Sequence, residues 1–99
     1  MYLTRSQELE GNRYIETMND LLGGEIRSRS RRHDLSWGRF IVADALQSRL
    51  GFTASAAAQF LDRDHSTSVH WKRNIKTMLE YPVMYAYENE LYIDFNSRI

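Results

Sequence analysis

The sequence predicts an all-α single domain, a small bundle of about five helices. Three observations favour it. The chain has 99 residues, so two domains would each be too small to bury a core. It contains one proline, so long helices are possible almost everywhere. Apolar residues recur at helical spacing through much of the chain, and the apolar (42%) and charged (26%) fractions are ordinary for a globular protein.

The first predicted helix ends near residue 22. Its stripe has the i, i+1, i+4, i+7, i+8 spacing of an amphipathic helix and consists of Tyr14, Ile15, Met18, Leu21 and Leu22. Gly23-Gly24 follows and predicts a left-handed C-cap. Residues 25–34 then alternate Arg and Ser without apolar periodicity, which indicates an exposed basic loop.

Two further helices are predicted between this loop and residue 62. The first has Asp34 or Ser36 as its N-cap, ends at Gly51, and buries Trp37, Phe40, Ile41, Ala45, Leu46 and Leu50. Thr53 caps the second, which runs from Ala54 to about Leu61. Its small residues Ala56, Ala57 and Ala58 allow close approach of a neighbouring helix. Asp62 marks a tight turn.

A fourth helix is predicted to begin at Asp64 as N-cap and to end at or before Tyr81, because Pro82 restricts the residue before it. Its buried stripe includes Val69, Ile75 and Leu79. Residues 83–99 fit two structures. A helix would bury Met84, Tyr87, Leu91 and Phe95; a hairpin would turn at Glu88-Asn89-Glu90. The helix is favoured.

Composition and spacing exclude several functions. The absence of cysteine excludes a disulfide scaffold, a thiol nucleophile and a thiolate zinc site. His65 and His70 lie about 140° apart on a helix without a carboxylate to complete a triad, so no metal is expected. Gly23-Gly24 lacks the Lys-Ser/Thr of a phosphate-binding loop, and we expect no cofactor. An Asp62, Asp64 and His65 hydrolase site is a distant alternative, so we expect no enzyme.

The apolar runs are too short for a membrane span or a signal peptide, which predicts a soluble cytoplasmic protein without membrane contact. Trp37 and Trp71 are expected to pack in the core or on the surface of the protein rather than to stack on bases. Since a capped amphipathic helix follows Met1, we expect a complete small protein rather than a fragment of a longer chain.

Charge is distributed unevenly although the net charge is zero. Residues 25–80 carry ten Lys or Arg against six acids, a net charge of +4, whereas residues 1–24 and 81–99 each carry −2. Arginines outnumber lysines eleven to two. Because the guanidinium group is planar and bonds two acceptors at once, this bias favours phosphates and guanine edges as partners. The alternative is a set of solvated arginines.

The start of the fourth predicted helix is unusually polar. A short helix, a tight turn and a longer helix form a helix-turn-helix, whose second helix presents its N-terminal residues to base edges in the major groove. Here Arg63 suits guanine, Asp64 suits cytosine, and Thr67 suits the thymine methyl group. Ser66 and His65 suit acceptors or phosphates. N-capping alone is the competing interpretation for Asp64 and for Ser66-Thr67.

Residues 63–70, Arg-Asp-His-Ser-Thr-Ser-Val-His, resemble the Arg-Asp-His-Thr/Ser-Thr-Val-x-His signature of the C-terminal DNA-binding domain of bacterial DnaA, the chromosomal replication initiator. Residues 28–32 are similar to the basic loop of that family. The similarity covers roughly residues 14–80. It implies a Trp-repressor-like helix-turn-helix fold and sequence-specific binding of double-stranded DNA, in replication initiation or its regulation. A replication or mobile-element protein is a possible partner, and the nucleoid the expected location.

The resemblance also implies roles for individual residues. Arg31 corresponds to an arginine inserted into the minor groove, with Arg29 and Arg32 beside it in the basic loop Arg27–Arg32. Arg39 and Thr53 would meet the DNA backbone, and His70 would lie near a phosphate. The residues facing bases in the major groove would be Arg63, Asp64, His65, Ser66 and Thr67.

The chain departs from the family pattern in ways that favour an alternative. Leu61-Asp62 replaces a Gly-Gly pair, Ser68 replaces a valine, and Gln47 and Asn74 replace basic residues. The ATPase module of the initiator is absent, which predicts a free-standing DNA reader. These changes, the acidic ends and the six tyrosines also suit a protein-interaction module with weak or no DNA binding.

Overall fold

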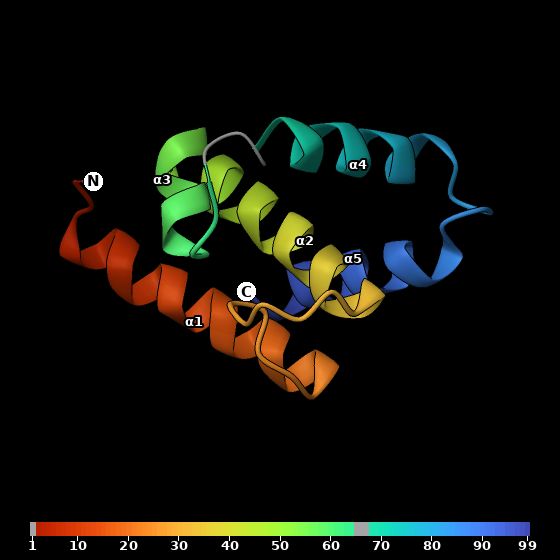
Figure 1. The fold of residues 1–99 in the computed structure, drawn as a ribbon, viewed down its shortest axis with the longest axis horizontal. Helices are drawn as coiled ribbons and strands as arrows, with labels where there is room; N and C mark the ends of the chain where they lie inside the picture. Colours follow the sequence, from red (N-terminus) through yellow and green to blue (C-terminus); the bar gives the residue numbers. More distant parts are fainter. Residues whose placement is uncertain (1, 65–67) are drawn as a thin grey trace.

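A computed structural model describes residues 2–64 and 68–99, apart from the side chains of Ser68 and Val69. These residues form five helices and no strand: α1 (Arg5–Leu22), α2 (His33–Leu50), α3 (Ala54–Phe60), α4 (Ser68–Glu80) and α5 (Ala86–Arg98) (Figure 1). The all-α prediction is confirmed, and the tail forms a helix rather than a hairpin. Among the described helices, none is long and apolar enough to cross a membrane.

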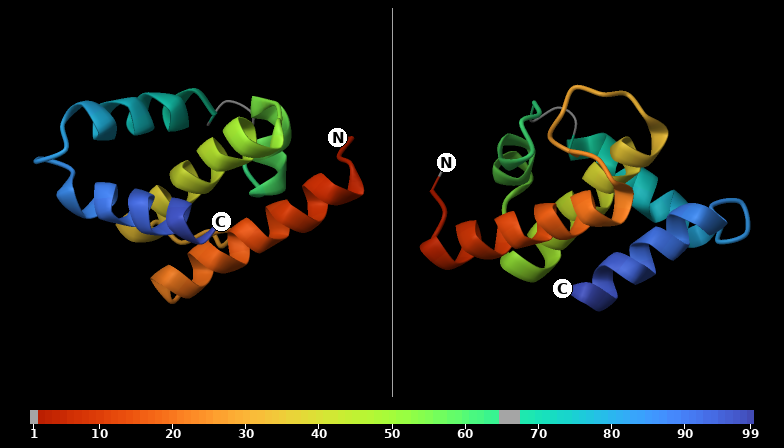
Figure 2. Two further views of the ribbon diagram at one scale, coloured as in Figure 1. Left: turned by 180° about the vertical axis from the view of Figure 1, so that it is seen from behind. Right: turned by 90° about the horizontal axis from the view of Figure 1, so that it is seen from below.

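Helix α2 is the centre of the molecule. It packs against each of the other four helices, and α4 and α5 lie on different sides of it (Figures 1 and 2). The side chains of Ile41, Val42 and Leu46 are fully buried, and Trp37 is also in the core. Because every helix rests on α2, a residue of α2 has a fixed position relative to the whole core.

Capping residues set the ends of the first two helices. Thr4 and Gln7 form a capping box that starts α1, and Gly23 ends it with φ +63° as predicted. The prediction of Asp34 or Ser36 as N-cap of α2 is wrong: α2 begins at His33, and Arg32 is its N-cap. The Asp34 carboxylate lies inside the first turn, where it binds the guanidinium group of Arg32.

The connection after α3 is a tight turn, as predicted. Thr53 caps α3 by accepting a hydrogen bond from the backbone N–H of Ala56. At the other end Asp62 has φ +57°, and the N–H groups of Asp62 and Arg63 donate to the carbonyls of Gln59 and Ala58. This pattern is a Schellman motif, which fixes the direction of the chain leaving α3. The described part of α4 begins at Ser68, so the predicted start at Asp64 involves residues outside the described ones.

The buried face of α4 differs from the prediction. Trp71 and Ile75 are buried as expected, but Leu79 is 49% exposed and Met78 is fully buried. Met84 and Tyr87 are exposed as well, and the buried stripe of α5 is Leu91 and Phe95. The predicted buried stripe of α4 was therefore wrong by one residue at its end, where Met78 replaces Leu79. The predicted stripe of the tail began too early, because it included Met84 and Tyr87.

Gly38 of α2 provides a test of this packing. A Cβ atom there would lie 2.7 Å from Leu22 Cδ1, 3.0 Å from Ile26 Cγ2 and 3.2 Å from Met18 Cγ. Overpacking a core costs about 1–3 kcal/mol, more than the roughly 1 kcal/mol that alanine gains over glycine in a helix. The difference between these two effects is roughly 0–2 kcal/mol, so we expect Gly38→Ala to lower the free energy of unfolding by about 1 kcal/mol in urea denaturation. Ser48→Ala, exposed on the same helix, is the control; equal stability of the two variants would contradict this packing.

Candidate nucleic-acid interface

The basic loop between α1 and α2 is anchored to α1 at its start. The backbone N–H of Ile26 donates to Asn19 Oδ1 at 2.9 Å, and the N–H of Arg27 donates to Glu25 Oε1 at 2.9 Å. The Ile26 side chain is fully buried. The loop therefore leaves α1 in a fixed direction, although it has no regular secondary structure.

Arg39 of α2 fixes the middle of the loop by hydrogen bonds to its backbone carbonyls. Its Nη1 donates to the carbonyls of Ile26 at 2.9 Å and Ser28 at 3.5 Å, and its Nη2 donates to the Ser30 carbonyl at 3.3 Å. The residue is only 7% exposed. Burial, followed by the nearby charge of Arg63, lowers the pKa of Arg39 from its ordinary value. Arg39 was predicted to meet the DNA backbone, and that role stays a prediction; in the structure its guanidinium group bonds loop carbonyls.

Two more arginines join the loop to α3 and the turn after it. Arg27 Nε donates to the Phe60 carbonyl at 2.8 Å, and its guanidinium carbon lies 4.8 Å from the centre of the Phe60 ring. From the turn, Arg63 Nη2 donates to the Ser28 carbonyl and Nη1 to the Asp62 carbonyl at 2.9 Å. The basic loop thus runs beside the end of α3, as seen from below in Figure 2.

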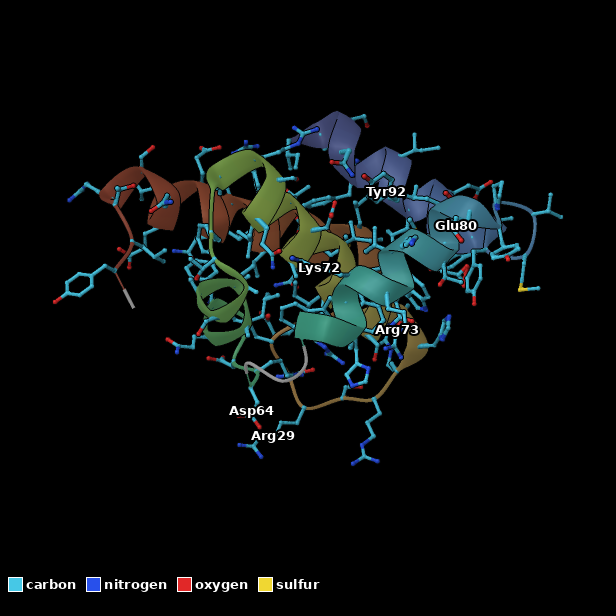
Figure 3. All side chains as sticks on the ribbon, turned by 90° about the horizontal axis from the view of Figure 1, so that it is seen from above. Arg29, Asp64, Lys72, Arg73, Glu80 and Tyr92 are labelled. Carbon is cyan, nitrogen blue, oxygen red and sulfur yellow. The ribbon has the colours of Figure 1, made fainter. Side chains whose placement is uncertain are left out.

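Arg29 and Arg31 are exposed, and within the described residues neither makes a hydrogen bond or ion pair. Together with Ser30 and with residues of α2 and the turn they line an open hollow of about 580 Å³. Its other lining residues are Arg39, Asp62, Arg63 and Asp64. Arg29 and Asp64 project from the same edge of the molecule (Figure 3). We call this hollow the arginine hollow.

The arginine hollow has an excess of positive charge. Four guanidinium groups and two carboxyl groups line it. Like charges at short range repel, most strongly where water is partly excluded. After burial, the charge of Arg63 is the second cause that lowers the pKa of Arg39. An anion entering the hollow would reduce this repulsion. Within the described part of the chain, no three His, Asp or Glu side chains come together as a metal site.

Arg32 and His70, two further predicted site residues, are not among the residues that line the hollow. Arg32 forms an ion pair with Asp34 at 2.7 Å; this contact raises the pKa of Arg32 and lowers that of Asp34. His70 is exposed on α4. His65, Ser66 and Thr67 lie outside the described residues. The position of Asp62 in the wall of the hollow and the inward direction of Arg27 were not predicted. Their only sequence signals are the turn expected at Asp62 and the position of Arg27 beside apolar Ile26.

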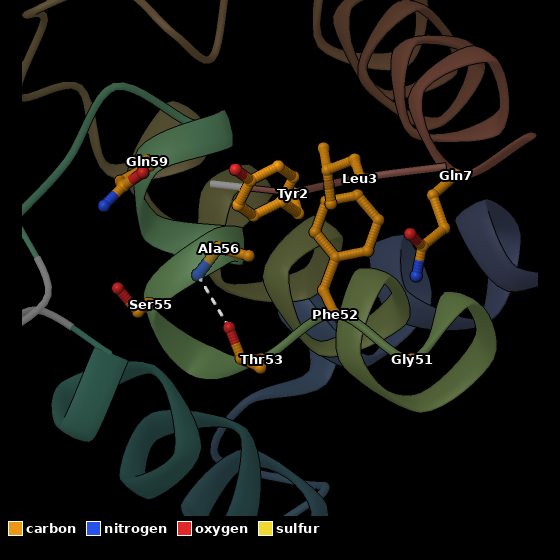
Figure 4. A pocket seen from close by; sticks show the side chains of 9 residues that line it. All are labelled: Tyr2, Leu3, Gln7, Gly51, Phe52, Thr53, Ser55, Ala56 and Gln59. Carbon is orange, nitrogen blue, oxygen red and sulfur yellow. Dashed lines mark hydrogen bonds between the residues drawn. The ribbon is translucent and has the colours of Figure 1, made fainter. Parts of the chain in front are cut away.

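Thr53 lies at a different hollow, of about 290 Å³, between the N-terminal segment and α3 (Figure 4). Its walls include Tyr2, Leu3 and Phe52, and none of the described residues that line it has a charged side chain. The Thr53 hydroxyl accepts from Ala56 N at 3.0 Å there. The neutral walls make this hollow unsuited to an anion, in contrast with the arginine hollow.

No protein-family model, curated protein or solved structure matches the chain. Function is therefore inferred from the residues and their geometry.

The contacts of Arg39 can be tested without a ligand. Arg39→Ala leaves loop carbonyls without their donor, and a lost hydrogen bond to a partly buried group costs about 1–3 kcal/mol. We expect urea denaturation to show a loss of stability of about 2–3 kcal/mol. Arg31→Ala, which removes an outward arginine of the same loop, should change stability by less than about 0.5 kcal/mol. Equal losses in the two variants would contradict the inward position of Arg39.

Proposed function

We propose that the chain binds double-stranded DNA in a sequence-specific manner. The observation that carries the proposal is the arginine hollow, where two exposed arginines without partners among the described residues stand beside the connection between α3 and α4. A cationic surface that can release counterions from DNA supplies affinity for any sequence. A narrow minor groove attracts arginine side chains through its negative potential, which suits Arg29 and Arg31.

Specificity would come from the connection between α3 and α4. In the proposed complex α3, the turn at Asp62 and α4 act as a helix-turn-helix, with Asp64 and residues 65–67 facing bases in the major groove. The resemblance of residues 63–70 to the DnaA signature supports these roles. Base contacts are needed because phosphate contacts carry no sequence information. One monomer would then reach two adjacent grooves, in replication initiation or its regulation.

The proposal is tested by anisotropy titration of a labelled duplex carrying a DnaA-type box and of a scrambled duplex, each at two salt concentrations. We expect salt-sensitive binding that prefers the box by at least about a hundredfold, near the low end of specific recognition. Equal binding to both duplexes would contradict specific reading of the box. A random-sequence selection that enriches no motif would contradict specific DNA binding altogether.

Arg29 and Arg31 should account for a defined part of the salt dependence of DNA binding. Each cation that neutralises a phosphate contributes about 0.9 to the slope of log K against log salt. We expect the Arg29→Ala, Arg31→Ala double variant to flatten this slope by about two units. Arg5→Ala, an exposed arginine at the start of α1, serves as the control and should leave the slope unchanged. An unchanged slope in the double variant would place the DNA elsewhere.

A second candidate function is self-association through the turn between α4 and α5. Tyr81, Pro82, Val83 and Met84, which we call the apolar tip, are exposed at one end of the molecule (Figure 1). Val83 is 91% and Met84 75% exposed. The tip is held in place, since the Tyr85 ring packs 5.6 Å from the Trp37 ring and Asn89 Nδ2 donates to the Met78 carbonyl at 2.9 Å. The fold thus supports an exposed apolar surface.

A second copy of the chain fits the tip better than a charged partner does. The α4 turn that leads into the tip carries both signs, with Lys76 Nζ 3.9 Å from Glu80 Oε1. A two-fold interface must be complementary to itself, and a rim of both signs allows Lys76 of one copy to face Glu80 of the other. With Leu79 and Tyr87, the tip exposes on the order of 500 Å² per copy, at the low end for a weak specific dimer.

Self-association is tested by analytical ultracentrifugation over a concentration series. The wild-type mass should rise toward that of a dimer, while the Val83→Ser, Met84→Ser variant should need at least about tenfold higher concentration, because its apolar contact area is lost. Leu9→Ser, an exposed leucine on α1, is the matched control. The chain lacks cysteine, so oxidation of Val83→Cys should give a covalent dimer, and Leu9→Cys should not. A wild-type protein that stays monomeric would exclude this function.

A further inference from the structure

We infer that Arg63 is a positioning residue, which couples the basic loop to the connection between α3 and α4, rather than a reader of a base. The inference rests on the proposed function, because it assigns the loop and the connection to two grooves of the same DNA. Its physical basis is a set of hydrogen bonds that Arg63 makes within the protein.

Both terminal nitrogens of the Arg63 guanidinium group have acceptors in the protein. Nη2 donates to the Ser28 carbonyl, and Nη1 donates to the carbonyls of Asp62 at 2.9 Å and Leu61 at 3.4 Å. The residue is half-buried. Bidentate recognition of guanine needs two donors of one guanidinium edge. Arg63 therefore points its guanidinium group at backbone carbonyls of the loop and the turn, which orients the group within the protein.

The backbone of Arg63 is fixed independently of this contact. Its N–H donates to the Ala58 carbonyl at 2.8 Å, in the Schellman motif that follows α3. Asp62, with positive φ, reverses the chain just before it. The side chain therefore starts from a defined point on α3 and ends on a defined carbonyl of the loop. Together with Arg27, which bonds the Phe60 carbonyl, this side chain sets the distance between the loop and the end of α3.

The Ser28 carbonyl is shared by two arginines. Arg39 Nη1 approaches it at 3.5 Å from α2, while Arg63 Nη2 approaches it from the turn. The two positive charges are close enough that Arg63 contributes to the lowered pKa of Arg39. The repulsion is tolerated because both cations bond loop carbonyls. Ser28 is adjacent to Arg29, so a shift of this carbonyl moves the outward arginines of the loop.

Coupling of this kind predicts that substitutions of Arg31 and Arg63 lower the affinity for DNA in a non-additive way. With Arg63 present, Arg31→Ala removes a well-placed contact. In the Arg63→Gln background the loop loses its anchor to the turn after α3, so the same change should matter less. We expect the fold-loss in affinity caused by Arg31→Ala on the preferred duplex to shrink at least about fivefold in that background, as for residues in one hydrogen-bond network. A base reader would give the same fold-loss in both backgrounds, and that result would overturn the inference.

A measurement on the free protein separates this inference from the proposed function. Hydrogen exchange of the Ser28 and Ser30 amides, which bond the Glu25 carbonyl and Ser28 Oγ, reports how well the loop is held. We expect exchange at least about tenfold faster in Arg63→Gln and Arg63→Ala, with unchanged exchange in α1 and α2 showing an intact fold. Arg31→Ala is the control and should not change it. Unchanged loop exchange in both Arg63 variants would overturn the inference even if DNA binds, whereas failure of wild-type protein to bind DNA would refute the proposed function alone.

Discussion

The candidate interface depends on the hydrogen bonds that the buried guanidinium group of Arg39 donates to the basic loop. A loop without regular structure leaves backbone carbonyls that need donors, and arginine offers five N–H donors in a fixed plane. Arg39 uses this capacity on Ile26, Ser28 and Ser30 in turn. Since α2 packs against every other helix, the loop takes its position from the core. A charged loop is thereby displayed with little of the ordering cost that binding would otherwise incur.

Apart from Arg32, which pairs with Asp34, the arginines of the loop region divide into two groups by direction. Arg27, Arg39 and Arg63 point inward and bond backbone carbonyls, whereas Arg29 and Arg31 point outward. The sequence predicted a basic surface, and the structure brings five of the predicted residues to one hollow. The sequence could not show which arginines point inward and which point outward. An inward arginine needs only a free backbone carbonyl, and every loop residue carries one. Which carbonyls face α2 depends on the path of the chain.

The helices were predictable where local chemistry decides them. Gly23, Thr53 and Asp62 mark boundaries through backbone conformation or capping, which needs no tertiary contact. The Thr4 and Gln7 pair has the spacing of a capping box and was available as a signal for the start of α1. Errors arose where tertiary contacts decide. Asp34 is drawn into an ion pair, and Met78 rather than Leu79 turns toward the core because α5 covers that side of α4.

The proposed DNA binding and the proposed self-association would use different parts of the molecule, so neither proposal excludes the other. The arginine hollow lies at the end of α4 that follows the turn from α3, and the apolar tip lies at its opposite end. A helix of 13 residues spans about 20 Å. Two copies joined at their tips would therefore keep both hollows open to solvent. Each hollow keeps its excess positive charge in such a dimer, and a bound polyanion would lower that repulsion in both copies. If both proposals hold, a second contact of such a dimer on the same duplex would be intramolecular and would strengthen binding.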